Sequence, residues 1–132
     1  MNYLLDTHVF LWTVFDHRQL SKNASSVILD SDNEILVSLV TFWEIALKFN
    51  IGKISLKGVL PEELPQYAEK SGFEILGITP EVVSSFYKLP SIKHRDPFDR
   101  LIIWQCIQND ICMISKDNAI SEYAQYGLKF FW

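Results

Sequence analysis

Four carboxylates are the side chains in this sequence with the clearest capacity for chemistry. If the fold brought them together, they would repel one another strongly unless a cation lay among them. Carboxylate oxygens are hard ligands that suit Mg²⁺ or Mn²⁺, and few reactions other than phosphoryl transfer need such a cluster. We therefore predict a divalent-metal site formed by Asp6, Glu44, Asp99 and Asp117.

The expected strands would place these acids along one rim of a sheet. Short, continuously apolar segments separated by helical patterns indicate a mainly parallel sheet between two helical layers, an α/β/α sandwich. Asp6 and Asp117 follow expected strands, and Glu44 lies near the start of a helix that follows one. Asp99 begins a helix that leads into a parallel strand, and such a helix normally starts at the same rim. Strands are expected at residues 3–5, 34–38, 73–78 and 111–115, with a possible edge strand at 128–132.

Helices are expected between these strands, with boundaries set by capping residues and by residues that stop helices. Thr41 is the expected N-cap of the helix after the second strand, and Gly52 lies just beyond the end of that helix. Ser21 is the expected N-cap of a helix that runs up to a loop at 30–33. Further helices are expected at residues 7–15, 41–50, 61–71, 79–88, 97–107 and 117–126.

The segment HRDPFDRLIIWQC, residues 94–106, holds two acids three positions apart. Proline is favoured at the first position of a helix, so we expect the helix to begin at Pro97 with Asp96 as its N-cap. The apolar residues that follow would anchor this helix in the core. We therefore predict that Asp96 has a structural role, and that Asp99 is presented to the metal from the first turn.

Each acid also has a purely structural interpretation. Asp6 and Asp117 could cap the helices that follow them, and Thr41 with Glu44 matches the T-x-x-E capping box. Asp99 on a first helical turn would interact favourably with the helix dipole. The expected convergence of all four acids on one rim favours the metal site.

The composition excludes several classes of protein. The chain has 132 residues, 48% of them hydrophobic, which predicts one globular domain over residues 1–132. A net charge of −4 argues against general nucleic-acid binding by bulk charge, so a polyanion would need local cations or a metal. Cys106 and Cys112 are expected to be small buried hydrophobes, which fits a reducing cytoplasm. We expect no signal peptide and no membrane contact.

Four segments of the chain resemble PIN-domain ribonucleases, and within that family the VapC toxins of bacterial toxin–antitoxin pairs. The segments are LLDTHVFLW (4–12), SLVTFWEIALK (38–48), HRDPFDRLIIWQC (94–106) and ISKDNAI (114–120). The family's catalytic acids fall on the four positions above, and its common hydroxyl after the first acid falls on Thr7. The chain departs from the family at Ser115, where threonine is common, and at Lys116.

The resemblance implies a Mg²⁺- or Mn²⁺-dependent endoribonuclease that cleaves cellular RNA, often a tRNA or an rRNA loop. It also implies a homodimer and a cognate antitoxin, a small protein that also binds DNA. The alternative is a PIN scaffold that has lost catalysis and binds protein or RNA. A phosphotransfer receiver is disfavoured because Asp6 is followed by Thr7 and the segment 73–80 carries no Asp. An Asp-x-Asp phosphatase is excluded because residue 8 is His.

Cations near these motifs are expected to hold substrate phosphates. The alternative for each is an ordinary solvated surface charge. The aromatic residues Trp12 and Trp43 are expected to contribute to a dimer face or to a groove for the antitoxin. The predicted substrate-binding residues are Thr7, Arg95, Arg100 and Lys116, with Lys48 as a further cation.

Overall fold

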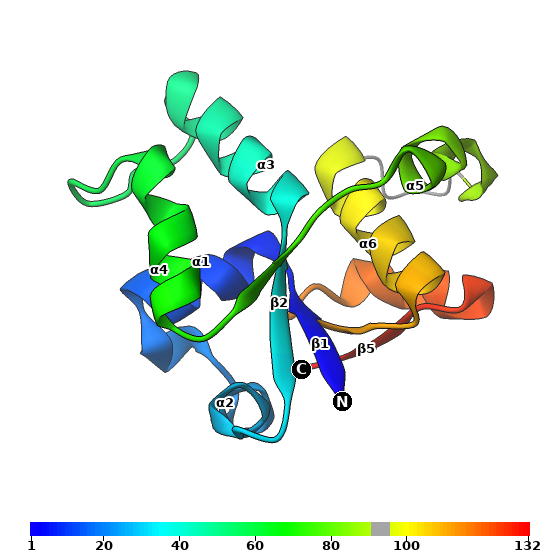
Figure 1. The fold of residues 1–132 in the computed structure, drawn as a ribbon, viewed down its shortest axis with the longest axis horizontal. Helices are drawn as coiled ribbons and strands as arrows, with labels where there is room; N and C mark the ends of the chain where they lie inside the picture. The colour runs from blue at the N-terminus through cyan, green and yellow to red at the C-terminus, as the bar shows by residue number, and fades with distance from the viewer. Residues whose placement is uncertain (91–95) are drawn as a thin grey trace.

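The centre of the fold is a sheet of five parallel strands in the order β3-β2-β1-β4-β5 (Figure 1). The computed structural model describes residues 1–90 and 96–132. Burial of both faces of a parallel sheet accounts for the short, continuously apolar segments of the sequence. The expected sheet is confirmed, with strands β1 (Asn2–Leu5), β2 (Glu34–Ser38), β3 (Glu74–Leu76), β4 (Cys112–Ile114) and β5 (Lys129–Phe131).

The strand order reverses beside the first strand. The chain builds β2 and β3 on one side of β1, then adds β4 and β5 on the other. Leu5 pairs with Val37 of β2 and with Ile114 of β4, so these three strands end at nearly the same level. In open parallel sheets, ligands bind beyond the carboxyl ends of the strands at such a reversal. We therefore expect a ligand site among the residues that follow β1, β2 and β4.

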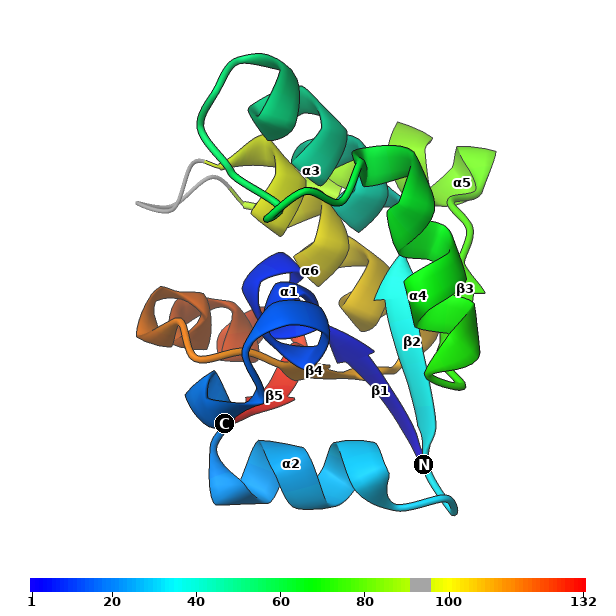
Figure 2. The same cartoon turned by 90° about the vertical axis from the view of Figure 1, so that its left-hand side faces the viewer.

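Helices cover both faces of the sheet, which confirms the expected three-layer α/β/α architecture. Leu5 packs in one buried cluster and its neighbour Leu4 in the other, because successive strand residues point to opposite faces. Figures 1 and 2 show α1, α2 and α4 on one side of the sheet and α5 and α6 on the other. The helices are α1 (Thr7–Phe15), α2 (Lys22–Leu29), α3 (Leu39–Asn50), α4 (Leu64–Lys70), α5 (Pro80–Ser84) and α6 (Pro97–Asn109).

The expected start of α3 at Thr41 is wrong. The N-cap is Ser38, the last residue of β2, whose hydroxyl accepts a hydrogen bond from the Val40 amide at 3.0 Å. Because the helix follows the strand without a loop, Thr41 is buried inside the first turn and cannot cap it. The proposed capping box of Thr41 and Glu44 therefore does not exist, and Glu44 lies on the second turn of α3.

Other expected elements differ at their ends. The segment expected as a helix at 117–126 forms a 3₁₀-helix, Asn118–Tyr126, between the side-chain cap of Asp117 and a left-handed Gly127. The helix α6 extends to Asn109 because Asp110 adopts the left-handed conformation that closes it. Shorter 3₁₀ segments are His17–Gln19, Pro61–Glu63, which precedes α4, and Phe86–Lys88, which follows α5.

Both cysteines are free thiols, with Cys106 buried in the core and Cys112 half-buried. Burial raises the pKa of the Cys106 thiol far above its ordinary value, so this residue packs as an inert hydrophobe. Within residues 1–90 and 96–132, no helix combines the length and apolarity needed to cross a membrane.

Candidate active site

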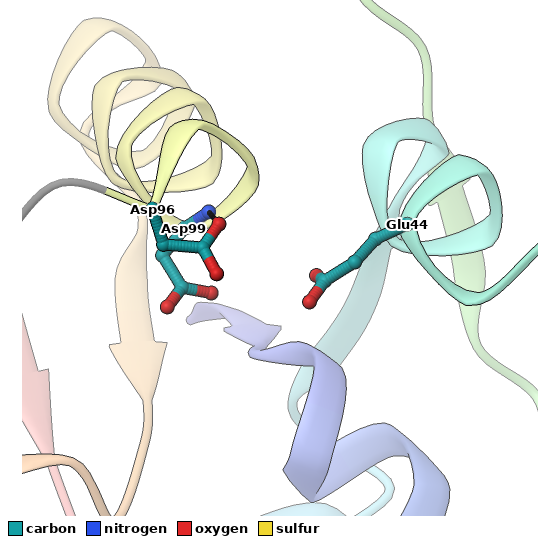
Figure 3. Close-up of side chains that lie close together, drawn as sticks. All are labelled: Glu44, Asp96 and Asp99. Carbon is teal, nitrogen blue, oxygen red and sulfur yellow. Dashed lines mark hydrogen bonds between the residues drawn. The ribbon is translucent and has the colours of Figure 1, made fainter. Parts of the chain in front are cut away.

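Three carboxylates converge between α3 and the start of α6 (Figure 3). One oxygen from each of Glu44, Asp96 and Asp99 lies within 4.8 Å of the others. Glu44 is only 1% exposed, whereas the two aspartates are half-buried. Hard oxygen ligands gathered this closely form a donor set for a divalent cation.

The geometry of α6 explains how two of these acids are held. One Asp96 oxygen accepts hydrogen bonds from the Phe98 amide at 2.9 Å and the Asp99 amide at 3.2 Å. Pro97 occupies the first helical position, and Trp104 ties the buried helix to α5 through a 3.1 Å hydrogen bond to the Val82 carbonyl. The predicted N-cap is confirmed. However, the second oxygen of Asp96 faces the acid cluster, a placement that local sequence patterns do not reveal.

Two substitutions of Asp96 separate its capping of α6 from its negative charge in the acid cluster. In Asp96→Ala the cap is lost, and we expect the free energy of unfolding to fall by about 1 kcal/mol, detectable by thermal melting. In Asp96→Asn the amide oxygen still caps α6, so stability should be nearly retained while the charge of the cluster is reduced. If the alanine variant melted like the parent chain, the capping role would be wrong.

Lys48 lies at the mouth of this cluster. Its ammonium donates a hydrogen bond to Glu44, one helical turn earlier on α3, and lies 3.9 Å from an Asp96 oxygen. Burial lowers the pKa of Lys48, but the hydrogen bond that its ammonium donates to Glu44 and the charges of Glu44, Asp96 and Asp99 raise this pKa overall. The lysine therefore stays charged and compensates part of the negative charge, the role that a metal ion would otherwise fill.

The Lys48→Met variant tests this compensation. Loss of the ammonium leaves the buried Glu44 carboxylate without its charged partner, so we expect a lower melting temperature in EDTA. Because the ammonium no longer competes with a cation, Mn²⁺ should bind about fivefold more tightly in a calorimetric titration, equivalent to about 1 kcal/mol. Lys53→Met, at an exposed position beyond α3, is the matched control and should change neither quantity. Unchanged Mn²⁺ affinity in Lys48→Met would contradict the interpretation.

Asp6 lies at the carboxyl end of β1 and is 8% exposed. One of its oxygens accepts from the Val9 amide at 2.8 Å, which caps α1, and the other accepts from the Ser115 hydroxyl. Burial raises the pKa of Asp6, against these hydrogen bonds, and the negative charge of Asp117 raises it further. A cation nearby would favour the charged form of this buried acid.

Two hydroxyls connect the acids across the carboxyl ends of the strands. Thr7, directly after Asp6, donates a 2.6 Å hydrogen bond to Glu44. Ser115, after β4, donates to Asp6 and accepts from the Asp117 amide at 3.1 Å. Ser115 thereby links the Asp6 carboxylate to the backbone of Asp117, and Thr7 links the segment after β1 to the acid of α3.

Asp117 and Asp6 lie outside the group of three acids but share a separate hollow. Asp117 is exposed, and one of its oxygens caps the 3₁₀-helix that follows, accepting from the Ala119 amide at 2.9 Å. The structure thus gathers Glu44 and Asp99 with the unexpected Asp96, and places Asp6 beside Asp117. Asp6 and Asp117 follow β1 and β4, Glu44 lies on the helix that follows β2, and Asp99 lies on α6.

The predicted phosphate-binding cations have different surroundings. Arg95 lies outside the described residues. Arg100 donates to the carbonyls of Leu89 at 2.9 Å and Pro90 at 3.3 Å and lies over the Phe86 ring. These contacts favour a structural role for Arg100 over phosphate binding. Lys116 is exposed, and its ammonium remains accessible to a ligand.

Comparison with known proteins places the chain in a family. The PIN domain family model matches residues 3–126, so this chain belongs to the PIN domain family, which confirms the assignment made from the sequence. Among curated proteins it is 32% identical over 120 residues to Ribonuclease VapC22 of Mycobacterium tuberculosis strain H37Rv, covering 91% of this chain and 90% of that protein.

Solved structures share the same fold. VapBC2 from Rickettsia felis, solved with a DNA fragment from the promoter, has a TM-score of 0.71 at 16% identity, with 99% of this chain and 98% of the other covered. VapBC-1 from nontypeable Haemophilus influenzae has a TM-score of 0.67 at 15% identity, with 99% and 97% covered. The PIN-like sandwich expected from the sequence is therefore also found in these proteins.

Proposed function

We propose that this chain is a metal-dependent endoribonuclease that hydrolyses phosphodiester bonds in cellular RNA. The observation that carries the proposal is the convergence of the Glu44, Asp96 and Asp99 oxygens within 4.8 Å. Its similarity to a curated ribonuclease over most of both chains supports the choice of RNA as substrate. The presence of the acids at every expected position argues against the alternative of a PIN scaffold without catalysis.

The residues present fit a divalent cation. The donors are carboxylate oxygens, and Lys48 already places one positive charge against them. We propose that Mg²⁺ or Mn²⁺ is held at the group formed by Glu44, Asp96 and Asp99. When bound, such an ion supplies a Lewis acid that makes water a stronger nucleophile and stabilises negative charge on the phosphate.

The chain's own residues divide the remaining tasks. Asp99, from the group of three acids, and Asp6, from the end of β1 next to the Thr7 that binds Glu44, are proposed to contact the metal most directly, and Glu44 and Asp117 to bind it or to orient the attacking water. Thr7 fixes one oxygen of Glu44 by donating to it, so that the other oxygen is directed towards Lys48 and the cluster. Lys116, exposed beside Asp117, is the described cation best placed to contact a substrate phosphate.

The chemistry of the cleaved ends tests this function. Purified protein would be incubated with tRNA and rRNA in Mn²⁺ or in EDTA, and the product ends identified. Attack by water with departure of the 3′ oxygen leaves 5′-phosphate and 3′-hydroxyl ends. Cyclic 2′,3′-phosphate ends, or equal cleavage in EDTA, would contradict the proposal because they indicate attack by the RNA's own 2′-hydroxyl or catalysis without a metal.

We further propose that the protein is the toxin of a VapBC-like pair, acting in the cytoplasm as a homodimer and silenced by a small DNA-binding antitoxin. The solved relatives are named as VapBC structures, and one contains promoter DNA. An apolar surface also supports a protein partner. Trp43 is 58% exposed, its ring centroid lies 4.9 Å from that of Phe98 in an edge-on arrangement, and it lines one hollow with the exposed Leu39 and Val83. Light scattering of the purified chain would test the homodimer. Co-purification with the product of the neighbouring reading frame would test the antitoxin.

A further inference from the structure

A hollow of about 240 Å³ lies beside the carboxyl end of β1, apart from the group of three acids. The lining contains two acids of the proposed catalytic set, the cation proposed to contact a substrate phosphate, and two aromatic residues to which the proposed hydrolysis assigns no contact. Those three side chains offer aromatic surface and positive charge rather than further carboxylates. The lining residues are Asp6, His8, Trp12, Lys116 and Asp117.

Trp12 forms the aromatic wall of this hollow. Its ring is partly exposed and lies 5.7 Å from the Trp132 ring, with the two planes tilted by 57°. His8, one helical turn earlier on α1, has its ring centroid 6.1 Å from that of Trp12. Because α1 is capped by Asp6 and packed in the core through Phe10, the indole is held in a defined place beside the acids.

Lys116 provides the positive charge. Its ammonium lies 5.9 Å from the centre of the Trp12 ring, a cation–π distance, and its side chain is exposed. It directly precedes Asp117 in sequence. A phosphate approaching Asp6 and Asp117 is repelled by their charges, and Lys116 is the residue in this hollow that offsets the repulsion.

An aromatic face, a cation and catalytic acids in one hollow match the chemistry of a nucleotide. Unpaired bases stack on tryptophan rings irrespective of their identity, and lysine contacts the adjoining phosphate. We propose that this hollow binds one unpaired nucleobase next to the scissile phosphate, stacked on Trp12, with Lys116 contacting the backbone. This proposal rests on the proposed ribonuclease function and assigns the stacking contact to Trp12.

Kinetics with a short single-stranded RNA in Mn²⁺ would test the subsite. Stacking on an aromatic side chain contributes about 1–3 kcal/mol, so Trp12→Leu should raise KM roughly 5- to 150-fold with little change in kcat. Trp12→Phe keeps an aromatic face and should retain most of the affinity. Lys116→Gln, at an exposed position, should raise KM less and weaken the dependence of KM on salt. Tyr87→Leu, which removes an exposed aromatic ring that does not line the hollow, is the control.

A binding measurement that needs no catalysis complements the kinetics. In EDTA, adenosine and uridine 5′-monophosphate should quench the tryptophan fluorescence of the parent chain, and Trp12→Phe should abolish the quenching because it removes the stacked indole. Equal quenching in Trp12→Phe, or an unchanged KM in both Trp12→Leu and Lys116→Gln, would overturn the subsite. If the parent chain cleaved no RNA while nucleotides still quenched Trp12, the ribonuclease function would fail and the base-binding hollow would stand.

Discussion

Asp99→Asn is expected to lower the rate of RNA cleavage in Mn²⁺ by about 100-fold or more, the scale found when one group that stabilises transition-state charge is removed. The substitution keeps the size and hydrogen-bonding capacity of the side chain but removes its charge from the acid cluster. Because Asp96, not Asp99, caps α6, the helix should still form. We therefore expect a melting temperature in EDTA close to that of the parent chain. Initial rates at saturating RNA, with circular dichroism melts, measure both quantities.

The opposite end of the same helix offers a matched control. Asp110 is an exposed carboxylate that caps the end of α6 and pairs with Lys129 at 2.7 Å. Asparagine tolerates the left-handed conformation found there, so Asp110→Asn should fold and cleave normally. If Asp99→Asn retained the parental rate, Asp99 would have no place in the metal site, whatever the behaviour of Asp110→Asn.

Mn²⁺ is expected to stabilise the folded chain strongly. A cation that binds only the folded state adds about 2.7 kcal/mol at 100 times its Kd, which for a domain of this size raises the melting temperature by roughly 10 °C. The physical reason is relief of repulsion among Glu44, Asp96 and Asp99, together with the buried Asp6. Differential scanning calorimetry in Mn²⁺ and in EDTA measures the effect.

Variants of the acids test whether this rise in melting temperature comes from Mn²⁺ bound at the group of three acids. Glu44→Gln and Asp99→Asn should both show a much smaller shift with Mn²⁺, because each removes one charged oxygen donor from the group of three. Asp110→Asn should show the full shift. A Mn²⁺ shift of equal size in all three variants would mean that the ion binds elsewhere on the protein.

Local patterns predicted most of the fold because burial and capping leave clear signals in the sequence. The segment around Leu4 and Leu5 is apolar at successive positions because β1 is covered on both faces. The start of α6 was predictable because Asp96 and Pro97 satisfy the geometry of a helix start from adjacent positions. The start of α3 was predicted wrongly at Thr41 because capping propensity does not show that β2 continues into α3 without a loop, which makes Ser38 the N-cap.

The site was less predictable than the fold because its contacts join distant segments. Asp6, Glu44, Asp99 and Asp117 were identified as a set by their places at strand ends and by family resemblance, whereas which of them meet depends on tertiary packing. The sequence accounted for Asp96 as an N-cap, so it gave no reason to expect that an Asp96 oxygen also lies near Glu44. For Lys48, the available signal was its spacing of four residues from Glu44 on one helix, which predicts an ion pair.

Anomalous diffraction from crystals grown with Mn²⁺ tests the metal site most directly. We expect a single strong manganese peak, or a close pair of peaks, among the carboxylates of Glu44, Asp96 and Asp99, with the Lys48 ammonium moved away from Glu44. Crystals of Asp99→Asn in the same solution should lose the peak. A parent structure at saturating Mn²⁺ that keeps the Lys48–Glu44 contact and shows no peak at these acids would contradict the proposed metal-dependent active site.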